Sequence, residues 1–415
     1  MDLHTSRYSA NTLLSRRVRA LRSSAIRDLL HDARRPGMLS LAGGLPAPDL
    51  FDVDGIEQSF AQVMREAPRQ ALQYGTTEGQ PALRESLAAL MAQRGATVNA
   101  DDLVVTSGSQ QAIDLLARAL VDPGDRVALE RPSYLAALQA FALSEAQFVT
   151  VPADAGGACV EQLFESSAPP PKLVYLVSNF ANPTGATLTL ARRRALLEWA
   201  LRRGVFIVED DPYGELRLDG VAPPPLIALA RELPGAESWC GYVSTLSKIV
   251  SPGLRIGFAV LPGWLREAVV RAKQALDLHT ASLAQEVADR YLRSGRLPAR
   301  LRLTCEVYRE RRDALCAALA GVLGGRLQFR RPDGGMFVWA RFTDGTDAEA
   351  LLPLAREQGV IFVPGAAFYD GEPDRAALRL SFATLEPAQL AAAVERLAAA
   401  YRLSSGFAAP QLRSA

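Results

Sequence analysis

The sequence predicts an α/β protein with two parts: a mostly parallel seven-stranded sheet between helices, and a smaller α+β part toward the C-terminus. Three observations carry this prediction. Short runs rich in valine, isoleucine and leucine alternate with helical stretches between residues 103 and 260, as strands buried on both faces of a parallel sheet require. After residue 326 the strands acquire a period of two and mix with helices, which is typical of an α+β domain. At 415 residues, the chain is also too long for one small core.

Seven apolar runs, each bounded by proline, glycine, aspartate or asparagine, are the expected strands of the large sheet. They are Leu103–Thr106, Asp125–Glu130, Gln147–Val151, Leu173–Val177, Val205–Glu209, Trp239–Val243 and Ile256–Val260. Helices are expected at Gln110–Leu120, Glu267–Ser294 and Pro298–Leu323. The C-terminal part is expected to hold strands at Met336–Arg341, Val360–Val363 and Leu378–Phe382, and helices at Asp347–Gln358 and Pro387–Tyr401.

These elements divide the chain into four segments. Residues 1–45 are expected to form an N-terminal arm or lid and a segment of the small domain. Residues 46–290 are expected to form the large domain, and residues 291–403 the small α+β domain. Residues 404–415 are expected to be a flexible tail.

Composition excludes several classes of function. A net charge of +1 gives no field that would attract nucleic acid or an anionic membrane. No apolar run is long enough for a membrane span, and no signal peptide is evident. The four cysteines are scattered without the spacing of metal ligands, so neither disulfides nor zinc are expected, and a cytoplasmic location fits. Residues 1–40 are rich in arginine without lysine or aromatic clusters, which favours a solvated or oligomer-contacting arm over a nucleic-acid arm.

The first sign of chemistry is the scarcity of lysine. Only three of the 46 basic residues are lysines, namely Lys172, Lys248 and Lys273. A guanidinium stays charged, whereas a desolvated lysine can lose its proton and form an imine. Lys248 lies among Thr245, Ser247 and Arg255, in a segment that a Pro-Gly pair constrains. The segment predicts a lysine that holds an aldehyde cofactor as a Schiff base, while its neighbours bind the phosphate of that cofactor. A solvated loop lysine is the alternative.

Other polar motifs follow the expected strands, on the side of an α/β sheet where ligands bind. Ser107-Gly108-Ser109-Gln110 opens a helix whose amides favour a phosphate, although the same residues also make an ordinary helix cap. Tyr134 follows the second strand, where its ring could stack on a planar heterocycle or pack in the core. Asn182-Pro183-Thr184-Gly185 follows the fourth strand, and it is either a plain turn or a means of aiming the Asn182 amide into the site.

An acidic cluster, Glu209-Asp210-Asp211-Pro212-Tyr213, ends the fifth strand. Carboxylates at the end of a buried strand are costly unless a cation partners them. A protonated pyridine nitrogen would partner Asp210, and Tyr213 could hydrogen-bond a phenolic oxygen of the same ring. A magnesium site is the alternative, but no other motif supplies a carboxylate at a strand end, so no metal is expected.

Taken in order, these motifs resemble the fold-type I aminotransferases of class I/II, which depend on pyridoxal 5′-phosphate (PLP). The landmarks cover nearly the whole chain: Gly43-Gly44-Leu45-Pro46, Tyr74-Gly75-Thr76-Thr77-Glu78-Gly79, Asn182-Pro183-Thr184-Gly185, Asp210-x-x-Tyr213, Ser247-Lys248 with Arg255, and Arg379-Leu380-Ser381-Phe382. Three further segments resemble the 2-aminoadipate and kynurenine aminotransferase subgroup: Ser24–Asp28, Ala42–Pro48 and Asp277–Thr280. Phe51-Asp52 departs from the Phe-Pro that is frequent in that subgroup.

The resemblance implies PLP as the cofactor and transamination between an L-amino acid and a 2-oxo acid, expected to be 2-oxoglutarate. The implied amino donors are 2-aminoadipate-like acids, glutamate, and aromatic or branched apolar amino acids. The implied catalytic residues are Lys248, Asp210 and Tyr213. The implied cofactor-binding residues are Tyr74, Gly108, Ser109, Gln110, Tyr134, Asn182, Asp210, Tyr213, Thr245, Ser247, Lys248 and Arg255. The implied substrate contacts are Gly44, Tyr74, Asn182, Arg379 and, on a mobile lid, Arg27. A homodimer with shared active sites is also implied, in which Tyr74 reaches the neighbour's cofactor phosphate.

Two other functions stay open. The same scaffold carries decarboxylases, lyases and racemases, and the sequence does not show which substrate bond is oriented for cleavage. Transcription regulators with an aminotransferase-like, PLP-sensing domain carry a winged-helix domain ahead of it. Here roughly 40 residues precede Gly43, fewer than a DNA-binding domain and its linker need.

Overall fold

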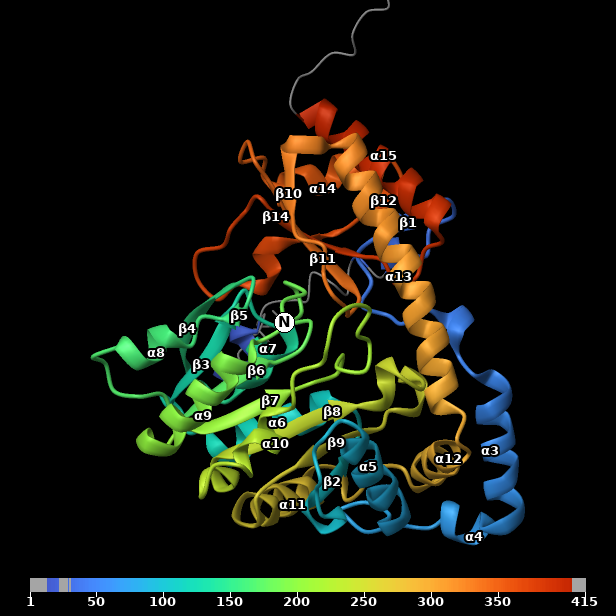
Figure 1. The fold of residues 1–415 in the computed structure, drawn as a ribbon, viewed down its shortest axis with the longest axis vertical. Helices are drawn as coiled ribbons and strands as arrows, with labels where there is room; N and C mark the ends of the chain where they lie inside the picture. The colour runs from blue at the N-terminus through green and yellow to red at the C-terminus, as the bar shows by residue number, and fades with distance from the viewer. Residues whose placement is uncertain (1–12, 22–28, 30, 405–415) are drawn as a thin grey trace, which may run out of the picture.

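The computed structural model describes residues 13–21, 29 and 31–404 (Figure 1). Its main feature is an eight-stranded sheet in the order β2-β9-β8-β7-β6-β3-β4-β5. The strands are β2 (Leu103–Thr106), β3 (Arg126–Arg131), β4 (Gln147–Asp154), β5 (Gly157–Ala158), β6 (Leu173–Val177), β7 (Phe206–Asp210), β8 (Cys240–Thr245) and β9 (Gly257–Val260). β9 is antiparallel to β2 and β8, β5 is antiparallel to β4, and all other neighbours are parallel.

All seven predicted strands of this sheet are present, with ends that differ from the prediction by at most three residues. The predicted number was one too low because β5 is only two residues long, Gly157–Ala158. So short a segment has no apolar pattern of its own. It becomes a strand because a turn brings it back to pair with the end of β4.

Helices cover both faces of the large sheet because its strands are apolar on both sides. In β6, Leu173, Tyr175 and Val177 belong to one core cluster, whereas Val174 and Leu176 belong to the other. The first face packs against α6 (Ser109–Leu120), α7 (Leu135–Leu143) and α11 (Gly263–Asp277). The second face packs against α5 (Pro81–Gln93), α8 (Glu161–Glu165), α9 (Leu190–Arg203), α10 (Leu226–Ala230) and α12 (Ser282–Arg293).

A second, antiparallel sheet has the order β10-β11-β14-β13. Its strands are β10 (Leu327–Phe329), β11 (Phe337–Phe342), β13 (Val363–Pro364) and β14 (Ala377–Ser381). It packs with α13 (Leu297–Val322), α14 (Ala348–Glu357) and α15 (Pro387–Ser404). β1 (Leu39–Ser40) pairs in parallel with β12 (Val360–Ile361), so a segment near the N-terminus joins the C-terminal part of the fold. The predicted strand Val360–Val363 is thus split between β12 and β13.

The helix α13 connects the two parts of the fold and runs along one side of the molecule in Figure 1. Beside its lower end, α3 (Val53–Glu66) and α4 (Pro68–Ala71) pack against α12. Short 3₁₀ helices complete the described elements: η2 (Pro48–Leu50), η3 (Ala100–Asp102), η4 (Ala236–Trp239), η5 (Leu246–Lys248), η6 (Pro252–Leu254), η7 (Gly324–Arg326) and η8 (Gly365–Phe368).

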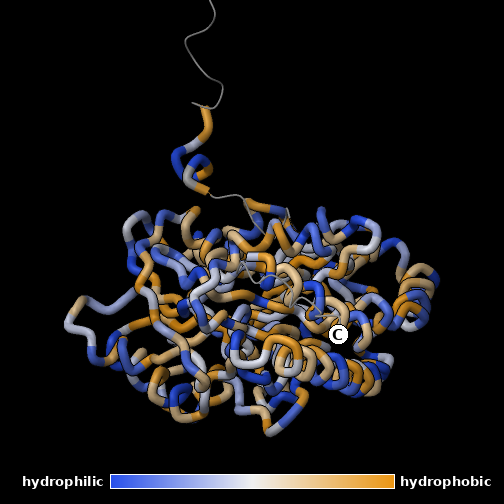
Figure 2. Tube along the Cα trace, turned by 90° about the horizontal axis from the view of Figure 1, so that it is seen from above, coloured by the Kyte–Doolittle hydropathy of each residue, from blue (hydrophilic) through white to orange (hydrophobic). Residues whose placement is uncertain are grey.

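The short helix α1 (Arg16–Ala20) stands outside the main body of the molecule (Figure 2). Arg16 of this helix forms an ion pair with Glu145, which follows α7. Val18 of the helix and Leu13, which precedes the helix, are exposed. Within the described residues, no helix is both long and apolar enough to cross a membrane.

Candidate active site

A cavity of about 330 Å³ lies where the strands β3, β6, β7 and β8 end, between the large sheet and β14. Twelve residues that the sequence predicted for the site line this one cavity, although they are scattered over more than 300 positions. They are Gly44, Ser109, Gln110, Tyr134, Asn182, Asp210, Tyr213, Thr245, Ser247, Lys248, Arg255 and Arg379. The carboxyl ends of neighbouring parallel strands meet at one edge of a sheet, and this explains how the topology gathers the residues that follow β6, β7 and β8. Arg379 reaches the cavity from β14 of the second sheet.

One corner of the cavity is built to hold an anion. The helix α6 begins at Ser109, after Gly108 with φ of 82°, so its first amides face the cavity with the positive end of the helix dipole. Arg255, held at φ of 53°, donates from Nη2 to the carbonyl oxygen of Ser107 at 3.1 Å. A Cβ atom at Gly257 would lie 2.4 Å from the backbone of Gly108. Glycine at this position therefore lets β9 pack against the turn that opens α6.

Two hydroxyl groups complete this corner. Thr245 ends β8, and its Oγ1 accepts a hydrogen bond from the amide of Ser247 at 3.1 Å. The same Oγ1 lies 2.8 Å from Ser247 Oγ, so the two hydroxyl groups hold each other in place at the start of η5. Together with Arg255 and the start of α6, they form a polar pocket of the kind that binds phosphate groups.

Lys248 ends η5 and is the amine of this cavity. Its Nζ donates a hydrogen bond to the carbonyl oxygen of Gly44 at 2.8 Å, and no carboxylate of the described chain forms an ion pair with it. Burial, together with the positive charges of Arg379 and Arg255, lowers the pKa of Lys248 to about 8. The lysine is therefore able to act as a neutral nucleophile or base at mild pH.

Asp210 is the last residue of β7 and is 1% exposed. Tyr175, from the neighbouring strand β6, donates a hydrogen bond to its Oδ2 at 2.5 Å. Its Oδ1 is buried and has no hydrogen-bond partner among the described residues. Burial, together with the nearby charges of Asp211 and Glu209, raises the pKa of Asp210 to about 7, although the hydrogen bond from Tyr175 acts in the opposite direction. The carboxylate therefore has one oxygen available for a cationic ligand.

The two acidic neighbours of Asp210 already have cationic partners. Glu209 pairs with the buried Arg193 at 3.2 Å. Asp211 pairs with Arg94. Its Oδ1 has no hydrogen-bond partner among the described residues, but Asp211 does not line this cavity. The acidic cluster thus leaves Asp210 as the carboxylate that faces the site.

Arg379, from β14, contributes a buried guanidinium to the opposite wall. It donates to Asn182 Oδ1 at 2.8 Å and to the carbonyl oxygen of Ala42 at 2.7 Å, and it lies 4.1 Å from the centre of the Phe337 ring. Burial lowers the pKa of Arg379 to about 10. No carboxylate of the described residues pairs with it, so an anionic ligand would find an uncompensated positive charge here.

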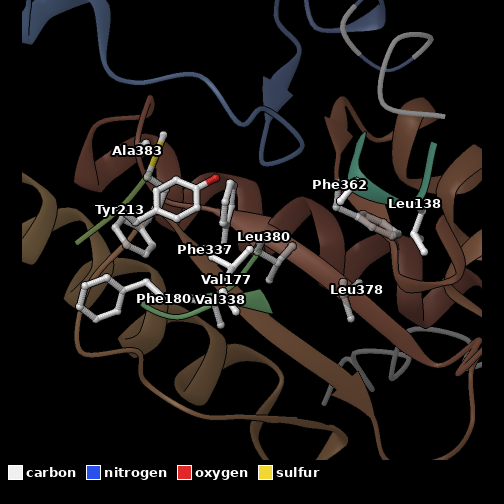
Figure 3. Packing of buried hydrophobic residues seen from close by; sticks show 14 of the residues in the cluster. Leu138, Val177, Phe180, Tyr213, Phe337, Val338, Phe362, Leu378, Leu380 and Ala383 are labelled. Atoms are coloured by element: carbon white, nitrogen blue, oxygen red, sulfur yellow. The ribbon is translucent and has the colours of Figure 1, made fainter. Parts of the chain in front are cut away.

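Two tyrosines flank the same space. Tyr134 precedes α7, and burial raises its pKa to about 12. Tyr213 follows β7, and its ring makes an edge contact with Phe337 at 6.0 Å between centroids (Figure 3). Burial also raises the pKa of Tyr213, so both hydroxyl groups stay protonated and can donate hydrogen bonds.

Three predicted residues do not line the cavity. Gly108 packs against the side chain of Arg255, and a Cβ atom at Gly108 would clash with the Arg255 guanidinium. Tyr74 is 78% exposed, and its ring makes an edge contact with His279. Arg27 lies outside the described residues.

Sequence reasoning missed Tyr175 and Phe337, which hold Asp210 and Arg379 in place. For Tyr175 a signal was available, because it is the one hydroxyl group in the buried run Leu173–Val177. A polar atom at such a position needs a partner, and the neighbouring strand supplies Asp210.

Comparison with known proteins places this geometry in a family. The family model of aminotransferase class I and II matches residues 49–397. The chain is 40% identical to a 2-aminoadipate transaminase of Thermus thermophilus over 385 residues, which are 92% of this chain and 94% of the relative. It is 39% identical to aromatic-amino-acid aminotransferase 1 of Thermococcus litoralis over 392 residues, 92% and 93% of the two chains.

A solved structure agrees with these relatives. The structure of LysN, an α-aminoadipate aminotransferase of Thermus thermophilus complexed with N-(5′-phosphopyridoxyl)-L-leucine, superposes with a TM-score of 0.89 and 38% identity. The match covers 97% of this chain and all of the other. The chain therefore belongs to the aminotransferase class I and II family.

Proposed function

We propose that this protein exchanges the amino group between an L-amino acid and a 2-oxo acid, with 2-aminoadipate-like acids, glutamate, and aromatic or branched apolar amino acids as donors and 2-oxoglutarate as acceptor. Its family makes it a PLP-dependent aminotransferase. The observation that carries the proposal is the meeting of Lys248, Asp210 and Arg379 in one cavity. Lys248 supplies an amine of lowered pKa. Among the described residues, Asp210 has an oxygen without a hydrogen-bond partner, and Arg379 has no carboxylate partner.

The donor groups of the cavity fit PLP. The unpartnered Oδ1 of Asp210 suits a protonated ring nitrogen. The corner made by Ser109, Thr245, Ser247 and Arg255 suits the phosphate. The ring would lie beside Tyr134, with Asn182 and Tyr213 near its hydroxyl group. When bound, PLP supplies an aldehyde that takes up amino groups and an electron-withdrawing ring that makes the substrate Cα–H bond acidic.

Three residues of the chain then have separate roles in the reaction. Lys248 Nζ takes the proton from the substrate Cα as a general base, because its lowered pKa leaves a neutral amine available near pH 8. Asp210 would accept a hydrogen bond from the ring nitrogen and keep that nitrogen protonated, while Tyr175 fixes the orientation of the carboxylate. Arg379 binds the substrate α-carboxylate with two parallel hydrogen bonds and so orients the Cα–H bond.

The role proposed for Arg379 explains how one site could accept amino donors with different side chains. The relatives named above act on 2-aminoadipate and on aromatic amino acids, whose side chains differ but whose α-carboxylates are the same. Arg379 would bind that shared group. We propose that Arg27, which lies outside the described residues, meets a distal substrate carboxylate.

We also propose a homodimer in the cytoplasm. Exposed apolar and aromatic side chains gather near Tyr74: Leu72 is 68% exposed and Leu278 is 42% exposed. Such exposure favours a protein partner, and a second copy would bring Tyr74 to the neighbour's PLP phosphate. All four cysteines are free, which suits a reducing compartment.

A spectral screen tests the reaction and its substrates. The PLP-loaded protein would be mixed with single amino acids, and conversion of the cofactor from its aldehyde to its amine form would be followed by absorbance. We expect conversion with 2-aminoadipate and glutamate, reversed by 2-oxoglutarate. Release of carbon dioxide, elimination products or D-amino acid without conversion would instead identify a decarboxylase, a lyase or a racemase.

Replacing Arg379 with lysine should lower kcat/KM about 10–100-fold, as expected for a lost charged hydrogen bond, and mainly through KM. The loss should be similar for acidic and apolar amino acids because the α-carboxylate is common to both. Arg375→Lys is the control, since Arg375 is 59% exposed at its side chain and pairs with Glu349. A loss confined to acidic substrates would show that Arg379 binds the side chain instead.

The pKa of Lys248 predicts how PLP uptake depends on pH. Because burial lowers the pKa of this cation to about 8, the neutral form that bonds to an aldehyde prevails above pH 8. The rate of uptake by the apoprotein should therefore rise about tenfold per pH unit below pH 8 and then level off. Binding of 4-deoxypyridoxine 5′-phosphate, which has no aldehyde, corrects for ionisation of the phosphate. A rate that keeps rising to pH 10 would contradict the lowered pKa.

A further inference from the structure

A second cavity, of about 620 Å³, lies next to the loop that carries Asn182 into the active site. Thr184 and Gly185 of that loop line this second cavity. Its other walls come from both parts of the fold: residues 152–155 and 217–223 from the large part, and residues 328–333 and 339–341 from the small part. Among the described residues, none lines both cavities. We call this space the arginine cavity.

Four arginines line the arginine cavity: Arg131, Arg217, Arg330 and Arg341. Within the described chain, only Arg341 has a carboxylate partner, Asp374. The lining also includes two carboxylates, and one of these, Asp154, is already bound by Arg192. Positive charge is therefore in excess in a protein whose net charge is only +1.

Arg217 shows this excess most clearly. Its guanidinium lies 4.6 Å from the centre of the Phe180 ring, and its Nη1 donates to the carbonyl oxygen of Asp219 at 3.3 Å. Its Nε and Nη2 are buried without a hydrogen-bond partner among the described residues. Burial lowers the pKa of Arg217, and within the described residues the lining Asp333 opposes this through its charge alone, without a hydrogen bond to Arg217. A half-buried cation of this kind is costly unless an anion joins it.

The remaining lining suits an organic ligand rather than a bare ion. Arg131 lies 5.6 Å from the centre of the Tyr369 ring, and its Nε is also buried without a partner in the described residues. Trp339 and Phe329 add aromatic surface, and Val221 lies at the rim with 92% of its surface exposed. A cavity of this size that combines aromatic and apolar surface with convergent charged groups is typical of sites for small organic molecules.

We propose that the arginine cavity binds a small organic anion, with its acidic group toward Arg217 and Arg131 and a planar apolar body against Trp339 and Tyr369. The acidic group supplies the anion that both guanidinium groups lack. The planar body displaces water from aromatic surface. Because the walls belong to both parts of the fold, the ligand bridges them while leaving the active-site residues free.

The test is a fluorescence titration of the PLP-loaded protein with 8-anilinonaphthalene-1-sulfonate, a planar apolar anion. Arg217→Met should weaken its binding at least about tenfold, which is the loss of one charged hydrogen bond. The matched control is Arg202→Met, since Arg202 is exposed and remote from the cavity, and it should leave binding unchanged. The uncharged N-phenyl-1-naphthylamine should bind without sensitivity to Arg217. Equal affinity of wild type and Arg217→Met for the anion would overturn the proposal.

A second pair of variants keeps the test valid if Arg217→Met does not fold. Val221 is almost fully exposed, so Val221→Asp and Val221→Asn should both fold, and they differ in one charge at the rim. Only Val221→Asp should weaken binding of the anion, and both should keep full transaminase activity. Identical affinities of the two variants would contradict a site that selects for negative charge.

Competitors locate the probe and identify the acidic group. Saturating 2-aminoadipate should leave the bound probe in place, and displacement by it would put the probe in the active site and overturn the proposal. Displacement by phenyl phosphate but not by 3-phenylpropionate would assign the cavity to phosphate esters, and the reverse result would assign it to carboxylates. If neither compound displaces the probe, the cavity takes neither phosphate esters nor carboxylates, the probe is an adventitious ligand, and the proposal is overturned.

Discussion

Replacing Lys248 with alanine is expected to lower kcat about 10³-fold or more, the scale on which a positioned general base contributes to catalysis. Lys248 is the only amine among the described residues of the active-site cavity, so no neighbour can replace it. PLP binding should weaken but persist, because the phosphate corner with Arg255 and Ser247 is untouched. Kinetics and equilibrium dialysis with PLP separate these two effects.

Chemical trapping checks the same residue without relying on activity. Borohydride reduction of the PLP-loaded protein should fix one PLP per chain on Lys248, as peptide mass analysis would detect. Lys172 forms an ion pair with Asp125, Lys273 forms one with Asp277, and neither lysine lines the cavity. Lys172→Ala is the matched control and should keep full activity. A reduced adduct on Lys172 or Lys273 would refute the assignment.

The sequence was sufficient to place Lys248, Asp210 and Asn182 in one site because each follows a buried strand of the same sheet. Strand ends are local features: an apolar run stops and a polar residue begins. Since parallel neighbours end at the same edge, the position of each side chain relative to the others follows from the topology. Arg379 lies in an antiparallel strand of the other part, so its placement rested on resemblance and not on strand pattern.

Features that depend on long-range contacts were not predictable in this way. The hydrogen bond from Tyr175 to Asp210 requires the register of β6 against β7, which no local pattern specifies. The pairing of Leu39–Ser40 with Val360–Ile361 joins segments more than 300 residues apart. No sequence pattern marks Arg217. Its Nε and Nη2 lack hydrogen-bond partners among the described residues only because of the way both parts of the fold pack around it.

Replacing Asp210 with asparagine is expected to lower kcat/KM about 10²–10³-fold, comparable with the loss of one preorganised electrostatic contact. Asparagine keeps the shape of the side chain but cannot hold the ring nitrogen in its protonated state. Tyr175→Phe should cost about tenfold, because the carboxylate remains but loses the hydrogen bond that orients it.

Thermal unfolding of the apoprotein separates this role from a structural one. Burial raises the pKa of Asp210 to about 7 in the folded protein, above its ordinary value of 3.8. The folded state therefore binds the proton more tightly, and the stability of the apoprotein falls as pH rises from about 4 to 7. Asparagine removes this cost, so the Tm of apo Asp210→Asn at pH 8 should equal or exceed that of wild type.

The neighbouring carboxylate should behave in the opposite way. Asp211 accepts hydrogen bonds from Arg94 and from Asn179, in a buried network away from the active-site cavity. Asp211→Asn leaves Arg94 with less compensation for its charge, and breaking a buried ion pair costs about 3–5 kcal/mol of unfolding free energy. Its Tm should therefore fall, while kcat/KM of the folded fraction changes little. The opposite result is that Asp211→Asn keeps its Tm and loses activity while Asp210→Asn turns over normally. In that case Asp211 is the residue that faces PLP, and Asp210 has no role in catalysis.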